Sequence, residues 1–320
     1  MRRLVALLLL CTALGAGPAR AADACGNPPL PQIPPQRVVV VHQQAIEILL
    51  ALGLEDRIAA AGYLDDALPP DLQTGFDRIP IRFDRYLATE AVAGLLPDLV
   101  LGGFAAAFGA GGLGPRETFA GLGIPTHVLA SGCMTAGDDP VATAIADIRQ
   151  MGALFDRRQR ADALVAEIEA GLEALQPGPA LTVFIYDGGE KAPYTIGRDG
   201  LLTRLLARAG ARNAFDDTPG RWATVSWEAV LARDPDLILL VDTTADPAAE
   251  KRRRLEADPA LAGLRALQTG HVATIPFSET VAGIRSGTAA RHLARILAAA
   301  RQSAADAPLA GDAPSPHNIP

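Results

Sequence analysis

Aromatic, basic and amide side chains follow the short apolar segments of this 320-residue chain, where they could form a binding surface for a small molecule. Aromatic residues make up only 5% of the chain, yet many fall in these predicted loops rather than in core segments. The expected ligand contacts are His42, Gln43, Gln44, Tyr63, Phe83, Arg85, Tyr86, Phe104 and Phe108 in the first half, and Tyr194, Arg221, Trp222, Phe277 and Arg285 in the second. Asp65, Asp66, Asp187 and Glu190 lie in the same loops. Arginines between aromatic rings suit an anionic, planar ligand such as a ferric chelate, which they bind through charge and stacking.

Among these residues, His42 could also bind a metal directly, because imidazole is a common metal ligand. It could equally be a turn residue held by hydrogen bonds. The five histidines are His42, His127, His271, His292 and His317, and no two of them have the H-x-x-x-H spacing of a helical metal site. We therefore expect no metal site built from protein side chains.

Motifs that would indicate catalysis are missing from the sequence. There is no Gly-x-Ser-x-Gly nucleophile elbow and no phosphate-binding loop. Residues 109–114 match G-x-G-x-x-G, but they lie several residues beyond a predicted strand and Pro115 follows at once, which favours a flexible loop. We expect a protein that is not an enzyme. One alternative is an exported α/β hydrolase that uses His42 or His271, and another is a structural or sensory protein without a ligand.

Short apolar segments alternate with helical patterns, which predicts α/β units with mostly parallel sheets. Strands are expected at residues 37–41, 57–63, 98–101, 126–130, 181–186, 237–241 and 271–275, and helices at 43–52, 90–95, 115–122, 201–209, 227–232 and 286–300. Between the two sets, apolar residues recur at helical spacing from Ile145 to Leu175 and predict one long helix over residues 147–176. The expected fold is two Rossmann-like lobes, residues 37–146 and 177–302, joined by that single helix. Ligands of such sheets bind beyond the carboxyl ends of the strands, where the loop residues lie.

An internal repeat supports the two-lobe interpretation. Residues 90–101 align without gaps on residues 228–239, with seven of twelve positions identical. Each copy reads as a short helix, a Pro-Asp turn and a strand, and one copy lies on each side of the predicted long helix. The separation is far wider than the period of a solenoid. The alternative is a generic helix-turn-strand unit that occurs twice by chance.

The beginning of the chain is typical of an export signal. Arg2 and Arg3 precede an apolar stretch that is too short to span a bilayer, and small residues follow, so we expect cleavage after Ala21. A retained membrane anchor is the alternative. Residues 22–36 form a Pro-rich lead, and residues 303–320 are Ala-, Pro- and Asp-rich, which predicts a disordered tail.

Charge and cysteine content restrict the class of partner and the compartment. Removing residues 1–21 leaves 26 basic against 36 acidic residues, so the net charge changes from −7 to −10. A chain this acidic is a poor candidate for binding nucleic acid. Cys25 and Cys133 are the cysteines left after cleavage, and in an oxidising compartment they predict one disulfide. Two unpaired buried thiols are the alternative.

Several segments together resemble the ferric-siderophore and cobalamin solute-binding proteins of ABC importers. The similar segments are residues 37–41 with 47–58, and the paired motifs that begin at Glu90 and Ser226 and continue through Pro97-Asp98 and Pro235-Asp236. They cover residues 37–300 in the family's order. The sequence departs from the commonest pattern at His42-Gln43-Gln44, where relatives often have small hydroxyl residues.

This resemblance implies a function and a partner. It implies a monomeric periplasmic protein that captures a metal chelate between its lobes, a ferric siderophore first and cobalamin or a related cofactor next. Iron or cobalt would then arrive inside the ligand, and the protein would need no cofactor of its own. The resemblance also implies that Glu90 and Glu228, one per lobe, dock with arginines of a dimeric ABC permease in the inner membrane. The alternative role for each glutamate is stabilisation of a helix N-terminus.

Overall fold

The first lobe is built on a five-stranded sheet in the order β3-β2-β1-β4-β5, and all its neighbouring strands are parallel. The structure is a computed structural model that describes residues 25–306. The strands are β1 (Val38–Val41), β2 (Ile58–Gly62), β3 (Ile81–Phe83), β4 (Leu99–Gly102) and β5 (Thr126–Val128), and the helices are α1 (Gln43–Ala51), α2 (Pro70–Asp77), α3 (Thr89–Gly94) and α4 (Arg116–Gly121). The four valines of β1 have no exposed surface, because helices cover both faces of a parallel sheet.

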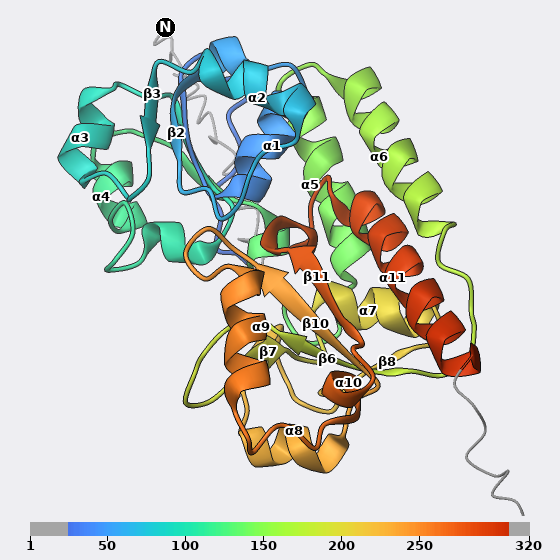
Figure 1. The fold of residues 1–320 in the computed structure, drawn as a ribbon. Coiled ribbons are helices and arrows are strands. Elements are labelled where there is room, and N and C mark those ends of the chain that lie inside the picture. Colours follow the sequence, from blue (N-terminus) through green and yellow to red (C-terminus); the bar gives the residue numbers. More distant parts are fainter. Residues whose placement is uncertain (1–24, 307–320) are drawn as a thin grey trace, which may run out of the picture.

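The second lobe repeats this architecture with a four-stranded parallel sheet in the order β11-β10-β6-β8. Its strands are β6 (Thr182–Tyr186), β8 (Arg212–Asn213), β10 (Leu237–Asp242) and β11 (Val272–Pro276), and β7 (Tyr194–Ile196) pairs antiparallel with β9 (Trp222–Thr224). Its helices are α7 (Leu201–Arg208), α8 (Trp227–Arg233), α9 (Ala248–Ala257), α10 (Arg265–Gln268) and α11 (Ser286–Asp306). Figure 1 shows the two lobes, with α5, α6 and α11 along one side. The predicted class, two α/β lobes with mostly parallel sheets, is confirmed.

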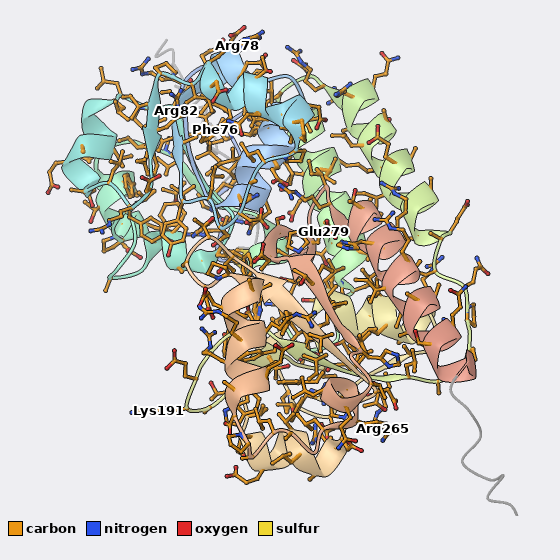
Figure 2. All side chains as sticks on the ribbon, in the orientation of Figure 1. Phe76, Arg78, Arg82, Lys191, Arg265 and Glu279 are labelled. Carbon is orange, nitrogen blue, oxygen red and sulfur yellow. A yellow bond between two sulfur atoms is a disulfide. The ribbon has the colours of Figure 1, made fainter. Side chains whose placement is uncertain are left out.

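The repeated Pro-Asp motif has the same structural role in both lobes. The Asp98 carboxylate accepts backbone hydrogen bonds from the two residues that lead into β1, at 2.7 and 2.8 Å. The Asp236 carboxylate accepts from the amide of Thr182 at the start of β6, at 2.8 Å. It also pairs with Arg265, which lies at the far end of the second lobe in Figure 2. Each aspartate therefore fixes the start of the neighbouring strand, which a chance similarity would not explain.

The connection between the lobes corrects one prediction. A single helix over residues 147–176 is wrong, because the chain forms α5 (Pro140–Leu154) and α6 (Arg158–Leu172) with a turn between them. Asp156 adopts a left-handed conformation at φ 53° in that turn, and Gly152 lets Ala161 of α6 pack closely on α5. The buried positions Phe155 and Leu164 are nine residues apart, about 900° of helix rotation, so they would lie on opposite faces of one continuous helix.

Helix α6 makes the physical link between the lobes. Near its start, Arg160 donates a hydrogen bond to the carbonyl of Ala51, the last residue of α1 in the first lobe (2.7 Å). Near its end, Gly171 packs against Gly287 at the start of α11 in the second lobe. Helix α6 thus contacts both lobes, in place of the single helix predicted over residues 147–176.

The close packing of α6 on α11 gives a stability prediction. A Cβ atom on Gly171 would lie 2.4 Å from the Cα atom of Gly287, and backbone cannot move aside as a flexible side chain can. Gly171→Ala is therefore expected to lower the free energy of unfolding by about 1–3 kcal/mol in urea denaturation. Gly94→Ala is the matched control, since this helical glycine has nothing within 4 Å, and it should be neutral or slightly stabilising. Equal effects of the two substitutions would contradict the packing argument.

The last helix is longer than the sequence predicts. The predicted end at residue 300 and the predicted disorder from residue 303 are wrong for residues 301–306, because α11 continues to Asp306. The predicted signal at residues 1–21 and the rest of the predicted tail lie outside the described residues. Between residues 25 and 306, no helix is long and apolar enough to cross a membrane.

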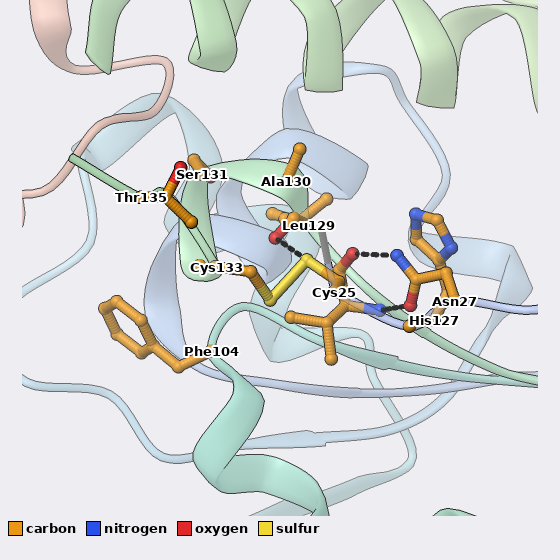
Figure 3. Close-up of a disulfide and its surroundings, with 12 residues drawn as sticks. Cys25, Asn27, Phe104, His127, Leu129, Ala130, Ser131, Cys133 and Thr135 are labelled. Atoms are coloured by element: carbon orange, nitrogen blue, oxygen red, sulfur yellow. Dashed lines mark hydrogen bonds between the residues drawn. A yellow bond between two sulfur atoms is a disulfide. The ribbon is translucent and has the colours of Figure 1, made fainter. Parts of the chain in front are cut away.

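A disulfide attaches the N-terminal lead to the first lobe. Cys25 is bonded to Cys133, which lies 108 residues later, with their Cα atoms 5.3 Å apart (Figure 3). Two residues on, the side-chain amide of Asn27 makes two 2.8 Å hydrogen bonds to the backbone N–H and carbonyl of Val128. The disulfide and the Asn27 side chain thus hold the lead against β5, the edge strand of the sheet.

Candidate functional site

A cavity of about 410 Å³ lies between the two lobes. It is at the carboxyl ends of β1, β2, β4 and β6, where ligands of open α/β sheets bind. Eight predicted contacts line it: His42, Tyr63, Tyr86, Phe104, Tyr194, Arg221, Trp222 and Phe277. The rest of the wall is Asp65, Ala105, Ala106, Gly132 and Asp187. Both lobes contribute, so a ligand here would contact both at once.

A second cavity of similar volume lies wholly within the second lobe, between β11 and α11. Its wall includes Leu237, the first residue of β10, and Gly270 and His271, which precede β11. These residues mark the amino ends of the strands, opposite to the edge where such sheets bind ligands. The interlobe cavity is therefore the better candidate site.

His42 links three segments of the first lobe. It follows β1 in a left-handed conformation, φ 76°, and Tyr63 follows β2 at φ 69°. Nδ1 of His42 accepts the backbone N–H of Phe104 at 3.1 Å, so the ring proton sits on Nε2, which lies 2.5 Å from the hydroxyl of Tyr86. Burial lowers the pKa of His42 to about 4, and the ring is neutral at physiological pH. With both nitrogens engaged, His42 is a hydrogen-bonded turn residue in this conformation.

The aromatic residues around His42 form one wall of the cavity. The rings of Tyr63 and Tyr86 are stacked with centroids 4.6 Å apart, and His42 meets both rings edge-on at 5.3 and 5.7 Å. Phe104 meets the histidine from the other side at 5.0 Å. Its ring also lies 6.1 Å from that of Trp222, across the junction between the lobes. The wall is a rigid aromatic surface suited to flat or apolar parts of a ligand.

Arg221 crosses from the second lobe to the first. Its guanidinium donates to the carbonyls of Ser131 and Gly132, at 2.8 and 3.0 Å, and lies 5.1 Å from the ring centre of Trp222. The receiving turn is preorganised, because the buried carboxylate of Asp147 accepts two of its backbone amides at 2.8 and 2.9 Å. Burial lowers the pKa of Arg221, yet the group stays charged. The arginine thus holds the lobes together and does not lie free in the cavity.

Behind the cavity, a buried polar cluster joins the lobes a second time; we call it the interlobe network. Arg285 of the second lobe contacts Glu47 of α1 through Nη2 and Nε at 2.5 and 3.0 Å. Ser278 donates through its amide and hydroxyl to Asp66 at 2.9 and 2.8 Å. Gln43 donates to both Glu47 and Asp66, at 2.9 and 2.6 Å. The interlobe network therefore consists of Gln43, Glu47, Asp66, Ser278 and Arg285.

Two carboxyl groups face the cavity, Asp65 after β2 and Asp187 after β6. Burial raises the pKa of each to about 6. For Asp65 the neighbouring charges of Asp66 and Asp187 add to this effect. For Asp187 the buried ammonium of Lys251 acts in the opposite direction, and Asp246 raises the pKa further. Both groups are only partly ionised near pH 6.

Comparison with known proteins agrees with this geometry. A family model described as "Periplasmic binding protein" matches residues 38–279. The chain belongs to the periplasmic binding protein family. The vitamin B12-binding protein of Pectobacterium carotovorum is 28% identical over 216 residues, covering 64% of this chain and 71% of that protein. An uncharacterized ABC transporter substrate-binding lipoprotein of Bacillus subtilis is 25% identical over 226 residues, covering 68% and 67%. The crystal structure of a periplasmic binding protein from Veillonella parvula has a TM-score of 0.76 at 25% identity, covering 83% and 92%.

Six of the predicted contacts lie outside the cavity of this binding protein: Gln43, Gln44, Phe83, Arg85, Phe108 and Arg285. Gln43 and Arg285 belong to the interlobe network instead, and Gln44 is buried next to Gly103. Phe83 packs on Gly62, where a Cβ atom would clash with it. The turn after β4 directs Phe108 back into the core, 6.0 Å from the ring of Phe119, and Arg85 is exposed.

Other members of the site had no signal in the sequence. Gly132 contributes a carbonyl to Arg221 and part of the cavity wall, and Glu47 and Ser278 complete the interlobe network. Glu47 reads as an ordinary polar position of a helix, although only 2% of its surface is exposed. The neighbouring Cys133, with its predicted disulfide, was the one available pointer to the turn that holds Gly132.

Glu90 and Glu228 lie on the outer surface of the binding protein, away from its cavity. Both are exposed in the first turn of a short helix, α3 in the first lobe and α8 in the second. Backbone and Ser226 hydrogen bonds lower the pKa of Glu228, which favours its charged form. In Figure 1, α3 lies at the left edge of the first lobe and α8 at the lower end of the second lobe. Each lobe therefore presents one exposed carboxylate of the repeated motif to solvent.

Proposed function

We propose that this chain is the extracytoplasmic substrate-binding protein of an ABC importer, which captures a small ligand between its lobes and delivers it to a permease. The observation that supports this most directly is the aromatic-lined cavity of about 410 Å³ that both lobes enclose in a member of the periplasmic binding protein family. Arg221 and the interlobe network close the lobes over that cavity from two sides. Capture by closure needs no catalytic group.

The proposed ligand is a metal chelate that brings its own iron or cobalt. A ferric siderophore comes first and cobalamin or a related cofactor next, since the motifs at Glu90 and Ser226 resemble those of proteins that bind these ligands. Relatives at 26–28% identity are named vitamin B12-binding proteins. The cavity is at the lower end of the range for ligand sites, so a ligand as large as a corrinoid would need the lobes to separate further.

The proposed setting is the periplasm, with residues 1–21 removed on export and the mature protein acting as a monomer. Glu90 and Glu228 would contact the two halves of a permease dimer. A hydrolase that uses His42 as a base is disfavoured, because both ring nitrogens of that residue are already hydrogen-bonded.

Fluorescence titration tests the binding function. Trp222 lines the cavity, whereas the indole of Trp227 packs on Tyr186 and donates to the carbonyl of Glu190, away from it. We expect saturable quenching by a ferric siderophore or cobalamin in the wild type and in Trp227→Phe, and its loss in Trp222→Phe. Calorimetry on all three proteins should show retained binding, because coloured ligands also absorb light. Failure of ferric hydroxamates, ferric catecholates, cobalamin and haem to bind the folded protein would contradict the proposal.

A further inference from the structure

The charged groups of the cavity wall do not match the anionic ligand that the sequence predicts. That prediction rests on arginines placed between aromatic rings. Arg221 is the cation of the cavity wall, and it already donates to the carbonyls of Ser131 and Gly132. His42 is neutral. The carboxyl groups of the wall are those of Asp65 and Asp187. When both are ionised, the wall has a net charge of −1 and its positive group is engaged elsewhere.

The two carboxylates differ from the other acids at the junction in having no hydrogen-bonded or ion-paired partner, and Lys251 acts on Asp187 only through its charge at longer range. Asp66 accepts hydrogen bonds from Ser278 and Gln43, and Asp246 pairs with Arg254 at 2.8 Å. Within residues 25–306, no hydrogen bond or ion pair reaches the carboxylate of Asp65 or Asp187. Both side chains are partly buried, and withdrawing a carboxylate from water without a partner costs free energy, so such groups are usually paired. Here the open partner position faces a cavity at the place where the fold binds ligands.

The surrounding rings reinforce the same preference. The faces of aromatic rings attract cations, and aromatic cages bind ammonium groups in proteins. The stacked pair of Tyr63 and Tyr86 lies on the first-lobe side with Asp65, and Tyr194 lies with Asp187 on the second. A cation between the lobes would therefore meet one carboxylate and one aromatic wall on each side.

We propose that the ligand presents a positively charged group to the cavity, held between Asp65 of the first lobe and Asp187 of the second. This inference rests on the proposed binding function and narrows its ligand class to cationic chelates. It also provides a reason for closure, because one cation shared between the two carboxylates attracts both lobes and offsets the repulsion between Asp65 and Asp187. An anionic chelate would instead meet two unpaired carboxylates and an arginine whose donors are partly used.

The proposal has a definite pH dependence. Asp65 faces Asp66 and Asp187, and Asp187 faces Lys251, Asp246 and Asp65. The pKa of both cavity carboxyls is about 6 in the empty protein, whereas that of His42 is about 4. Protonation below pH 6 removes the charges that hold the cation. Affinity should therefore be full above pH 7 and fall as the pH drops through 6.

A matched pair of probes tests the charge directly. Ferrioxamine B is a ferric trihydroxamate with a free ammonium group, and its N-acetyl derivative keeps the chelate but lacks that charge. We expect calorimetry at pH 7.5 to show at least tenfold tighter binding of ferrioxamine B. Asp65→Asn and Asp187→Asn should each weaken its binding about ten- to hundredfold while changing that of the N-acetyl derivative little. The preference of the wild type should shrink at pH 5.

Two exposed acids provide controls for general surface charge. Asp84→Asn in the first lobe and Glu190→Gln in the second remove the same charge outside the cavity, and affinity should change less than twofold. Equal binding of the two probes, or tighter binding of ferric enterobactin, which is anionic, would overturn the charge preference and leave the binding function standing. Absence of binding by every chelate, cobalamin and haem would overturn the proposed function itself, and the inference with it.

Discussion

Replacing Arg285 by Ala is expected to lower the free energy of unfolding by about 3–5 kcal/mol. The guanidinium is the positive group of the interlobe network, and it contacts Glu47 at 2.5 and 3.0 Å and Asp66 at 3.7 Å. The side chain of Glu47 is only 2% exposed, so its carboxylate would be left buried and without its cation. Urea denaturation followed by circular dichroism measures the loss, and a change below 1 kcal/mol would show that the network carries little stability.

The effect should depend on pH in a defined direction. Burial raises the pKa of Glu47 even while Arg285 and Gln43 act to lower it. Without the arginine the folded-state pKa rises further above that of the unfolded chain, so the folded state binds a proton more readily as the pH falls. The destabilisation in Arg285→Ala should therefore be larger at pH 8 than at pH 5. A penalty independent of pH would point to lost packing rather than to the unpaired carboxylate.

A double variant distinguishes the loss of the Arg285–Glu47 ion pair from the cost of leaving one buried charge unpaired. Arg285→Met with Glu47→Leu removes both charges and keeps apolar volume, so it should cost less than Arg285→Ala alone. Since the pair also joins the two lobes, the double variant should bind ligand more weakly even where its stability is close to that of the wild type. That combination would show that the network contributes to lobe closure as well as to folding.

The elements that the sequence predicted well depend on local information. The apolar runs of β1 and β10, and the Pro-Asp turns at Asp98 and Asp236, have signals within a few residues, and each formed where expected. The break between α5 and α6 also had a local signal in the half-turn offset between Phe155 and Leu164. That offset was missed because each half of the segment is helical by itself.

The sequence predicted those residues of the candidate site that directly follow a strand, and it did not predict the direction of the others. Residues directly after β1 and β2, such as His42 and Tyr63, face the cavity because parallel strands end at one edge. Gln43 begins α1 and Arg285 directly precedes α11, and both turn toward partners more than 20 residues away in sequence. Phe108 follows a turn that returns it to the core. Which loop residues face the ligand depends on these long-range contacts, and one sequence does not show them.

The same limit applies to ligand charge. In the sequence, Arg221 beside Trp222 reads as an anion-binding pair. In the structure its acceptors are carbonyls of Ser131 and Gly132, about 90 residues earlier. The charge that a ligand meets in the cavity therefore depends on which charged side chains already have partners in the protein. The number of charged residues in the loops does not determine it.

Removing Glu90 and Glu228, the proposed docking residues, is expected to abolish transport while leaving ligand affinity unchanged. Glu90 and Glu228 are exposed, lie one on each lobe, and are absent from the cavity wall. Charge-assisted hydrogen bonds from permease arginines to both carboxylates would fix the binding protein across the two halves of a dimer. In cells that carry the permease, uptake of the bound chelate should therefore fall to background for Glu90→Ala with Glu228→Ala, and only partly for either single variant.

Glu117 offers the control that separates docking from helix stabilisation. It is also an exposed glutamate in the first turn of a short first-lobe helix, α4 (Arg116–Gly121), but it lies outside the repeated motif. If the glutamates acted only on helix dipoles, all three alanine variants would lose about 0.3–1 kcal/mol of stability and transport would continue. If Glu90 and Glu228 dock, Glu117→Ala should transport normally while the double variant, equally folded and with unchanged affinity, does not. Loss of ligand affinity in the double variant would contradict both roles, because it would place these carboxylates at a ligand contact that the closed structure does not contain.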